Sequence, residues 1–153
     1  MQLRKATMAD VEPIRELIHT YAEQGLMLAK ARSAIYENIR EYILAEVNGK
    51  VIGVGGLHIL WHDLAEVRSL AIAESYRGQG IGHNIVAALE EEARILGVTR
   101  CFALTYQKEF FLSCGYTQVE NKDLPQKVWT ECINCPKFPD CDEFAVIKEI
   151  ELN

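Results

Sequence analysis

The sequence predicts an α+β fold built around a mixed β-sheet, and three observations support this prediction. A glycine-rich stretch, residues 77–82, lies between a strand-like run at 67–72 and a helix-like run at 83–96. Asn48-Gly49 separates two apolar runs and is the strongest two-residue signal for a β-hairpin. The segments follow the order β-α-α-β-β-β-α-β-α-β, which favours helices packed on a mixed sheet.

The chain begins with a short strand candidate at residues 2–6 and a first helix. Apolar residues at helical spacing from Val11 onward predict this helix, which is expected to end at Gly25. Ahead of it, Thr7 with Asp10 three residues later resembles a helix-capping pair.

A second helix and a hairpin are expected next. Residues 33–42 carry apolar side chains at helical spacing, which predicts the helix. Strands at 43–47 and 50–60 then flank the Asn-Gly turn, a loop follows at 61–63, and the next strand begins near Leu64.

The second half of the chain is expected to add a helix and two strands. Gly97 ends the helix that follows the glycine-rich stretch, and residues 100–106 form a strand. A short helix at 108–114 ends at Gly115, and a last strand is expected over 145–152.

Length and composition indicate one ordinary soluble domain spanning residues 1–153. No apolar run approaches the roughly 20 residues that span a membrane, and the N-terminus lacks a signal-peptide core, so we expect a cytoplasmic protein without a membrane partner. The net charge of −6 argues against nucleic acid as the main partner. A homodimer is compatible with the sequence.

The glycine-rich stretch is expected to bind phosphate. It consists of Arg77, Gly78, Gln79, Gly80, Ile81 and Gly82. Glycines bring backbone N–H groups close to an anion, and the positive end of a helix dipole adds attraction, so a pyrophosphate is the expected ligand. A P-loop is excluded because His83-Asn84 replaces the required Lys-Ser or Lys-Thr. A dinucleotide fingerprint fits poorly because this loop lies in the middle of the chain.

The pattern Arg-x-x-Gly-x-Gly after a strand that carries an acidic residue resembles the acetyl-coenzyme A loop of the GNAT N-acetyltransferases. The stretch from Phe110 to Tyr116 resembles the late helix of that family, followed by Gly and an aromatic residue. The order of elements is similar over nearly the whole chain. This resemblance implies a GNAT fold and an N-acetyltransferase that uses acetyl-CoA as its cosubstrate.

Five further stretches resemble the acetyltransferase domain of bacterial N-acetylglutamate synthases. They are Glu23-Gln24-Gly25, Ala31-Arg32-Ser33, Tyr36-Glu37-Asn38, Phe102-Ala103-Leu104-Thr105, and Leu124-Pro125 with Lys127. The resemblance implies acetyl transfer to the α-amine of L-glutamate, the first step of arginine biosynthesis. Long synthases carry an additional amino-acid-kinase-like domain that senses arginine, and we expect a short stand-alone form because 153 residues leave no room for it.

The resemblance also implies two parts of the catalytic machinery. Glu66, at the head of the central strand, occupies the position of the general base in GNATs such as the histone acetyltransferases. The alternative is a surface carboxylate at a strand edge. Backbone N–H groups near Leu70, Ala71 and Ile72 are expected to bind the cofactor and stabilise the oxyanion where a bulge opens the strand.

The general acid is not identified. Many GNATs place a Tyr where this chain has Phe111. Tyr106, Ser113 or Cys114 are alternatives, and coenzyme A leaving as its thiolate is another.

A glutamate substrate brings two carboxylates, which favour Arg or Lys in the pocket. Arg32 and Lys127 match the synthase pattern, and His58 falls where the long synthases carry a lysine. For Lys30 and Arg32 the alternative is a solvated loop, and for His58 a structural role. Arg68 is a weaker candidate because it can pair with a neighbouring carboxylate.

A cysteine-rich loop is expected at residues 132–141. Cys132, Cys135 and Cys141 are candidate ligands for zinc or an iron–sulfur cluster, both of which usually require four ligands. Asp140, Asp142, a histidine or Cys114 would complete such a site. Free thiols are the alternative.

Two other functions remain open. One is acetyl transfer to another small amine or to a protein N-terminus. The other is a non-catalytic sensor that binds acyl-CoA or a metal, an alternative that stays open because Phe111 stands where many GNATs carry a Tyr.

Overall fold

Seven strands form one mixed sheet in the computed structural model, which describes residues 1–125 and 143–152. The strands are β1 (Gln2–Lys5), β2 (Tyr42–Val47), β3 (Lys50–Trp61), β4 (Leu64–Ile72), β5 (Arg100–Thr105), β6 (Thr117–Val119) and β7 (Phe144–Glu149). Their order in the sheet is β1-β2-β3-β4-β5-β7-β6. Neighbouring strands are antiparallel except β4 and β5, which are parallel. The α+β prediction is confirmed.

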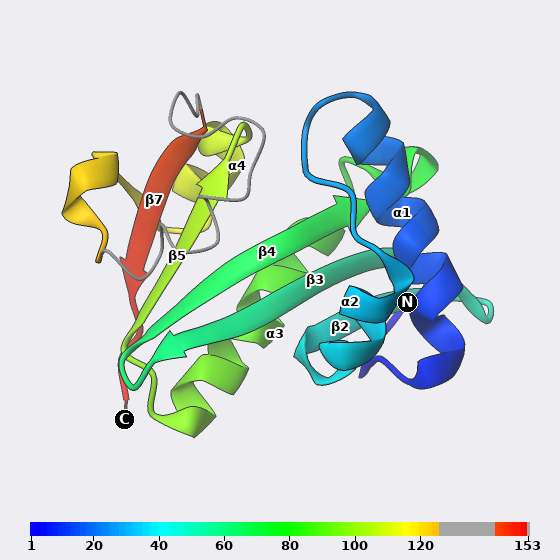
Figure 1. The fold of residues 1–153 in the computed structure, drawn as a ribbon, viewed down its shortest axis with the longest axis horizontal. Coiled ribbons are helices and arrows are strands. Elements are labelled where there is room, and N and C mark those ends of the chain that lie inside the picture. Colours follow the sequence, from blue (N-terminus) through cyan, green and yellow to red (C-terminus); the bar gives the residue numbers. More distant parts are fainter. Residues whose placement is uncertain (126–142, 153) are drawn as a thin grey trace.

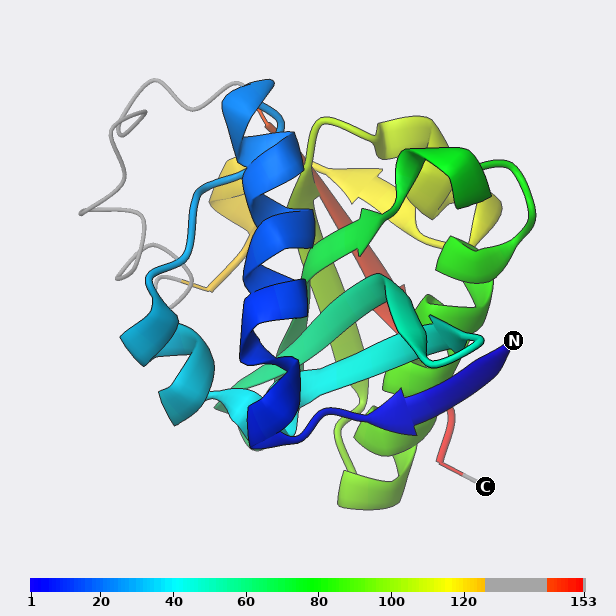
Figure 2. The same ribbon diagram turned by 90° about the vertical axis from the view of Figure 1, so that its right-hand side faces the viewer.

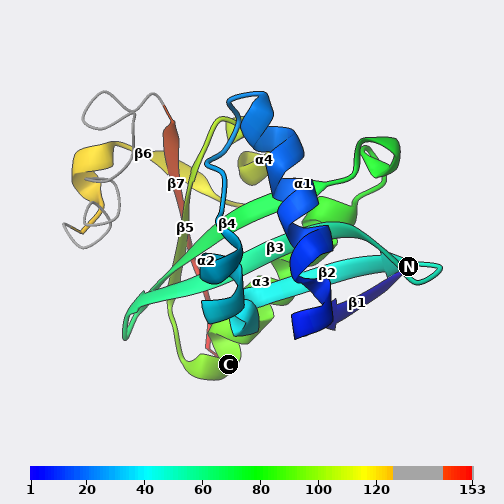
Figure 3. The same cartoon turned by 45° about the vertical axis from the view of Figure 1, so that its right-hand side comes forward.

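Helices cover both faces of this sheet (Figure 1). They are α1 (Val11–Glu23), α2 (Arg32–Glu37), α3 (Ile81–Leu96) and α4 (Lys108–Ser113), with 3₁₀ turns η1 (Met8–Asp10), η2 (Ile39–Glu41), η3 (Glu74–Tyr76) and η4 (Asn121–Asp123). Figures 2 and 3 show α1 and α3 on opposite faces of the sheet. Within the described ranges, no helix combines the length and apolar character needed to cross a membrane.

Glycines in β3 allow α3 to pack very close to the sheet. A Cβ atom at Gly55 would lie 2.6 Å from Ile85 Cγ2, and one at Gly53 would lie 3.1 Å from Ile85 Cδ1. The apolar face of α3 is fully buried here, with Ile85 and Leu89 both at 0% exposure. Any larger residue at Gly55 would force this helix away from the strand that it covers.

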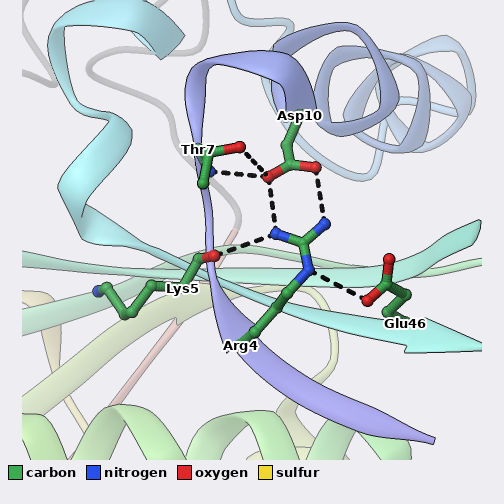
Figure 4. Close-up of polar contacts among 5 residues, drawn as sticks. All are labelled: Arg4, Lys5, Thr7, Asp10 and Glu46. Atoms are coloured by element: carbon green, nitrogen blue, oxygen red, sulfur yellow. Dashed lines mark hydrogen bonds and ion pairs between the residues drawn. The ribbon is translucent and has the colours of Figure 1, made fainter. Parts of the chain in front are cut away.

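An ionic network fixes the start of α1 against the sheet (Figure 4). Arg4 Nη1 and Nη2 each donate to one Asp10 oxygen at 2.8 Å, and Arg4 Nε donates to Glu46 Oε2 at 3.2 Å. The backbone N–H of Thr7 donates to Asp10 Oδ2 at 2.7 Å, which confirms the predicted capping pair. The hydrogen bond from Arg4 is the main reason that the pKa of Asp10 falls to about 2.

Two predicted turns are also confirmed. Asn48 and Gly49 both adopt positive φ angles, 51° and 77°, as a type I′ hairpin turn requires. Gly97 ends α3 in the left-handed region at φ 82°.

The structure corrects three details of the sequence analysis. The predicted helix at 33–42 ends already at Glu37, and Tyr42 begins β2, where it is 2% exposed. Trp61 belongs to β3 rather than to the following loop. Strand β6 was not predicted, because two of its three side chains are exposed and its partner β7 is distant in sequence.

Candidate active site

A cleft opens where β4 and β5 separate. The two strands pair only over residues 64–66 and 100–102, and they then diverge (Figure 1). The cleft has a volume of about 850 Å³ and is lined by both strands, the glycine-rich loop, the start of α4 and the segment that follows α1. Beyond Glu66, backbone groups that β4 directs toward β5 have no strand partner among the described residues.

A β-bulge shapes the wall of this cleft. Between the pairs Gly56–Arg68 and Val54–Ala71, one β3 residue faces two residues of β4. One of these two, Ser69, has a φ of 58°, which is unusual for a residue other than glycine.

The extra residue in the bulge shifts the alternation of β4 side chains between the two faces of the sheet by one position. Before it, Val67 packs beneath α3, whereas after it Leu70 packs there and Ala71 packs against α1. Leu70 and Ile72 line the cleft, whereas Ala71 is buried and does not. Whether the backbone at these positions binds the cofactor stays a prediction.

The glycine-rich loop lies at the end of the same cleft. Gly78 and Gly80 have φ angles of 77° and 79°, and an added Cβ would meet no atom within 4 Å at either position. Glycine is therefore required here by backbone conformation. Gly80 precedes the first turn of α3, so the N-terminus of a 16-residue helix adds positive potential at the loop.

Most residues of the predicted phosphate loop line the cleft, namely Arg77, Gly78, Gly80, Ile81 and Gly82. Gln79 is not among the described residues that line it. A Cβ on Gly82 would lie 3.1 Å from the Phe110 ring, so this glycine also allows α3 and α4 to approach each other.

Glu66 lies at the apex of the cleft, because it is the last β4 residue that pairs with β5. Its side chain is 15% exposed, and its Oε1 lies 3.8 Å from Arg68 Nη1. Arg68 also lines the cleft, and its Nη2 lies 3.4 Å from Glu41 Oε1. The arrangement brings a carboxylate able to accept a proton next to a cation within one cavity.

His58 is the cross-strand partner of Glu66 but is not among the described residues that line the cleft. Its Nδ1 lies 2.7 Å from Glu41 Oε2. Glu41 at the end of η2, His58 of β3, and Glu66 and Arg68 of β4 therefore form a row of ionisable side chains on one face of the sheet. Substrate binding by His58 stays a prediction.

Arg32 begins α2 and is 55% exposed. Its guanidinium is hydrogen-bonded to the Glu12 carboxylate of α1, and it is likewise not among the described cleft-lining residues. Lys30, two residues earlier, does line the cleft. Substrate binding by Arg32 stays a prediction. Of these two cations, Lys30 is the one that lines the cleft.

The candidate proton donors lie in different surroundings. Phe111 and Tyr106 line the cleft, and only Tyr106 carries a hydroxyl. Ser113 Oγ lies 2.8 Å from His83 Nε2, and His83 also lines the cleft. Burial raises the pKa of the Cys114 thiol, which disfavours it as an acid.

Some predicted residues cannot be compared with the structure. Lys127, Cys132, Cys135 and Cys141 lie outside the described residues. Within residues 1–125 and 143–152, no group of three or more His, Cys, Asp or Glu side chains is arranged to hold a metal ion.

Tyr21 and His83 line the cleft but were missed by the sequence analysis. Tyr21 belongs to the apolar spacing of the first helix, which gave no reason to assign it a site role. His83 follows the glycine-rich loop directly, and this position was the available signal.

Comparisons with known proteins agree with this geometry. The model of the acetyltransferase (GNAT) family matches residues 9–116. An uncharacterised N-acetyltransferase of Chlorobaculum tepidum is 38% identical over 148 residues, which cover 97% of this chain and 96% of that protein. An amino-acid acetyltransferase of Mycobacterium tuberculosis is 40% identical over 132 residues, which cover 84% of this chain and 75% of that protein.

A solved structure is similar over nearly the whole chain. It is a crystal structure of a Mycobacterium tuberculosis protein in complex with CoA and NLQ, with a TM-score of 0.85 and 34% identity. The similarity covers 99% of this chain and 100% of the other.

Proposed function

Because this chain belongs to the acetyltransferase (GNAT) family, we propose that it acetylates the α-amine of an amino acid, and of L-glutamate in particular. The chain is an acetyl-CoA-dependent N-acetyltransferase, as its family and its amino-acid acetyltransferase relative indicate. With glutamate as acceptor, the reaction would be the first step of arginine biosynthesis.

The observation that carries this proposal is the position of Glu66 beside Arg68 at the apex of a cleft that ends in the glycine-rich loop. An ammonium group must lose a proton before its nitrogen can attack a thioester. Glu66 accepts that proton directly or through a water molecule. The nitrogen then bonds to the carbonyl carbon, and the resulting oxyanion is stabilised by backbone N–H groups of the open stretch of β4.

Collapse of this intermediate breaks the C–S bond and releases coenzyme A as its thiolate. The nitrogen loses its second proton as the amide forms. One proton goes to the thiolate and one remains for the solvent, so the reaction releases a net proton. Tyr106 and His83 line the cleft and carry groups able to take part in this transfer.

Charge in the cleft supports an acidic acceptor. Lys30 and Arg68 both line it. Arg68 already contacts Glu41 and Glu66, so we propose that Lys30 is the cation that contacts the acceptor's carboxylate. The predicted contacts of Arg32, His58 and Lys127 would add to this set. A polyamine would instead require carboxylates without these cations.

The test measures release of free coenzyme A from acetyl-CoA across a panel of amino acids, with polyamines as controls. We expect selective turnover with L-glutamate. Lys30→Ala should raise the KM for glutamate about tenfold, the equivalent of one charge-assisted hydrogen bond. Lys50→Ala, at the exposed first position of β3 beside the hairpin turn, removes the same charge away from the cleft and should leave KM unchanged.

Turnover with polyamines and none with acidic amino acids would refute the glutamate proposal. Turnover with another amino acid would keep the amino-acid class and change only the acceptor. Coenzyme A binding without turnover on any amine would support the sensor alternative.

A further inference from the structure

The hydroxyl group of Tyr21 joins the last turn of α1 to the end of β4 and to the glycine-rich loop. Tyr21 Oη lies 2.6 Å from the Ile72 carbonyl oxygen and 2.8 Å from Arg77 Nε. A carbonyl oxygen can only accept, so the hydroxyl donates to Ile72 and accepts from the Nε–H of Arg77. One side chain therefore connects three elements that are separate in sequence.

The Tyr21 ring also contacts the Arg77 guanidinium. Arg77 Cζ lies 4.8 Å from the ring centroid, within the range of a cation–π interaction. The hydrogen bond and the ring contact together restrict the conformations that the Arg77 side chain can adopt. Arg77 is exposed at the mouth of the cleft, where a long side chain without such contacts would sample many rotamers.

We propose that Tyr21 is a positioning residue for the phosphate end of acetyl-CoA, an inference that rests on the proposed function. Tyr21 accepts the Nε–H of Arg77 beside the loop that Gly78 and Gly80 shape, so Nη1 and Nη2 are the donors that this guanidinium offers to a phosphate there. A guanidinium fork is well suited to bind two phosphate oxygens at once. Pre-ordering it reduces the rotamer entropy that is lost when the diphosphate binds.

This role differs from that of a structural tether in a measurable way. A tether that only holds α1 to β4 would affect every thioester donor equally. A residue that orients Arg77 toward phosphate should matter only for donors that carry the diphosphate. S-acetylpantetheine keeps the thioester arm of acetyl-CoA but lacks the diphosphate and the adenosine, so it separates the two roles.

The experiment compares wild type with Tyr21→Phe, which keeps the ring and removes the hydroxyl. The dissociation constant for CoA is measured by calorimetry, and kcat/KM is measured with acetyl-CoA and with S-acetylpantetheine. We expect CoA affinity and kcat/KM for acetyl-CoA to fall about tenfold, as for loss of a hydrogen bond to a charged group. The kcat/KM for S-acetylpantetheine should stay within about twofold of wild type.

Two further variants sharpen the test. Arg77→Ala should weaken CoA binding at least as much, and adding Tyr21→Phe to it should cause little further loss, because the two side chains act as one unit. Tyr36→Phe removes a hydroxyl from an exposed tyrosine on α2 and should match wild type in every assay.

Equal losses with both donors would assign Tyr21 a purely structural role and overturn the inference. Unchanged CoA affinity in Tyr21→Phe, or full additivity with Arg77→Ala, would overturn it as well. Failure of the proposed function is recognised separately, because wild type itself would then not bind CoA or would not acetylate any amine. That result would refute both the proposed function and the inference about Tyr21 that rests on it.

Discussion

Replacing Asp10 with Asn should destabilise the protein, because it removes the charge that Arg4 holds at the start of α1 (Figure 4). The pKa of Asp10 is about 2 in the folded protein against an ordinary value of 3.8. One pKa unit corresponds to about 1.4 kcal/mol, so the ionised carboxylate stabilises the fold by about 2 kcal/mol. Asp10 is only 6% exposed, so water screens this interaction weakly.

The pH dependence follows from the direction of the shift. Because the folded-state pKa is lowered, the stabilisation is complete above pH 3.8 and is lost as the pH falls toward about 2. Urea denaturation of wild type and Asp10→Asn should give unfolding free energies that differ by about 2 kcal/mol at pH 7. The difference should narrow steadily below pH 3.8.

Glu12→Gln is the matched control. Glu12 also lies on α1 and pairs with an arginine, Arg32, but both side chains are more than half exposed. Such surface pairs contribute little, so this variant should follow wild type at every pH. A difference between wild type and Asp10→Asn that stays constant from neutral to acidic pH would refute the electrostatic account. Equal stabilities at pH 7 would refute it too.

Two more predictions concern catalysis and packing. Glu66→Gln should lower kcat by about 10²- to 10⁴-fold, as expected for loss of a general base, and should leave CoA affinity unchanged. Steady-state kinetics measure this effect, and an unaltered kcat would show that Glu66 is not the base. Gly55→Ala should destabilise the fold by about 1–3 kcal/mol, because its Cβ would lie 2.6 Å from Ile85 Cγ2. Urea denaturation measures this loss, and strict additivity with Ile85→Ala would argue against the clash.

Local sequence signals predicted the elements whose conformation depends on their own residues. The Asn48-Gly49 turn and the end of α3 at Gly97 both need positive φ angles, which few residues adopt. The second helix is predicted too long because Tyr36, Ile39 and Ile43 follow helical spacing, although Ile43 belongs to β2, and a short apolar run does not distinguish helix from strand. Strand β6 depends on pairing with β7, which local sequence does not encode.

The sequence predicted only those parts of the candidate site that local motifs encode. The phosphate loop is a local motif, and most of it lines the cleft. The cations that reach the cleft depend on the separation of β4 from β5 and on the bulge at Ser69, which are tertiary features. Arg68 lines the cleft because it lies on β4 beyond the point where that strand leaves β5, and Lys30 lines it from the segment between α1 and α2. Arg32, chosen from a sequence pattern, pairs instead with Glu12.

The row of ionisable side chains formed by Glu41, His58, Glu66 and Arg68 lies between two separate apolar clusters on its face of the sheet. One apolar cluster, with Val54 and Ala71, lies beneath α1, and another forms around Phe102 at the other end of the row. Apolar side chains along the row would extend these clusters toward each other, but they would remove the carboxylate that we propose as the base and its neighbouring cation. If Glu66 is the general base that we propose, selection for stability alone and selection for acetyl transfer favour opposite kinds of residue at that position.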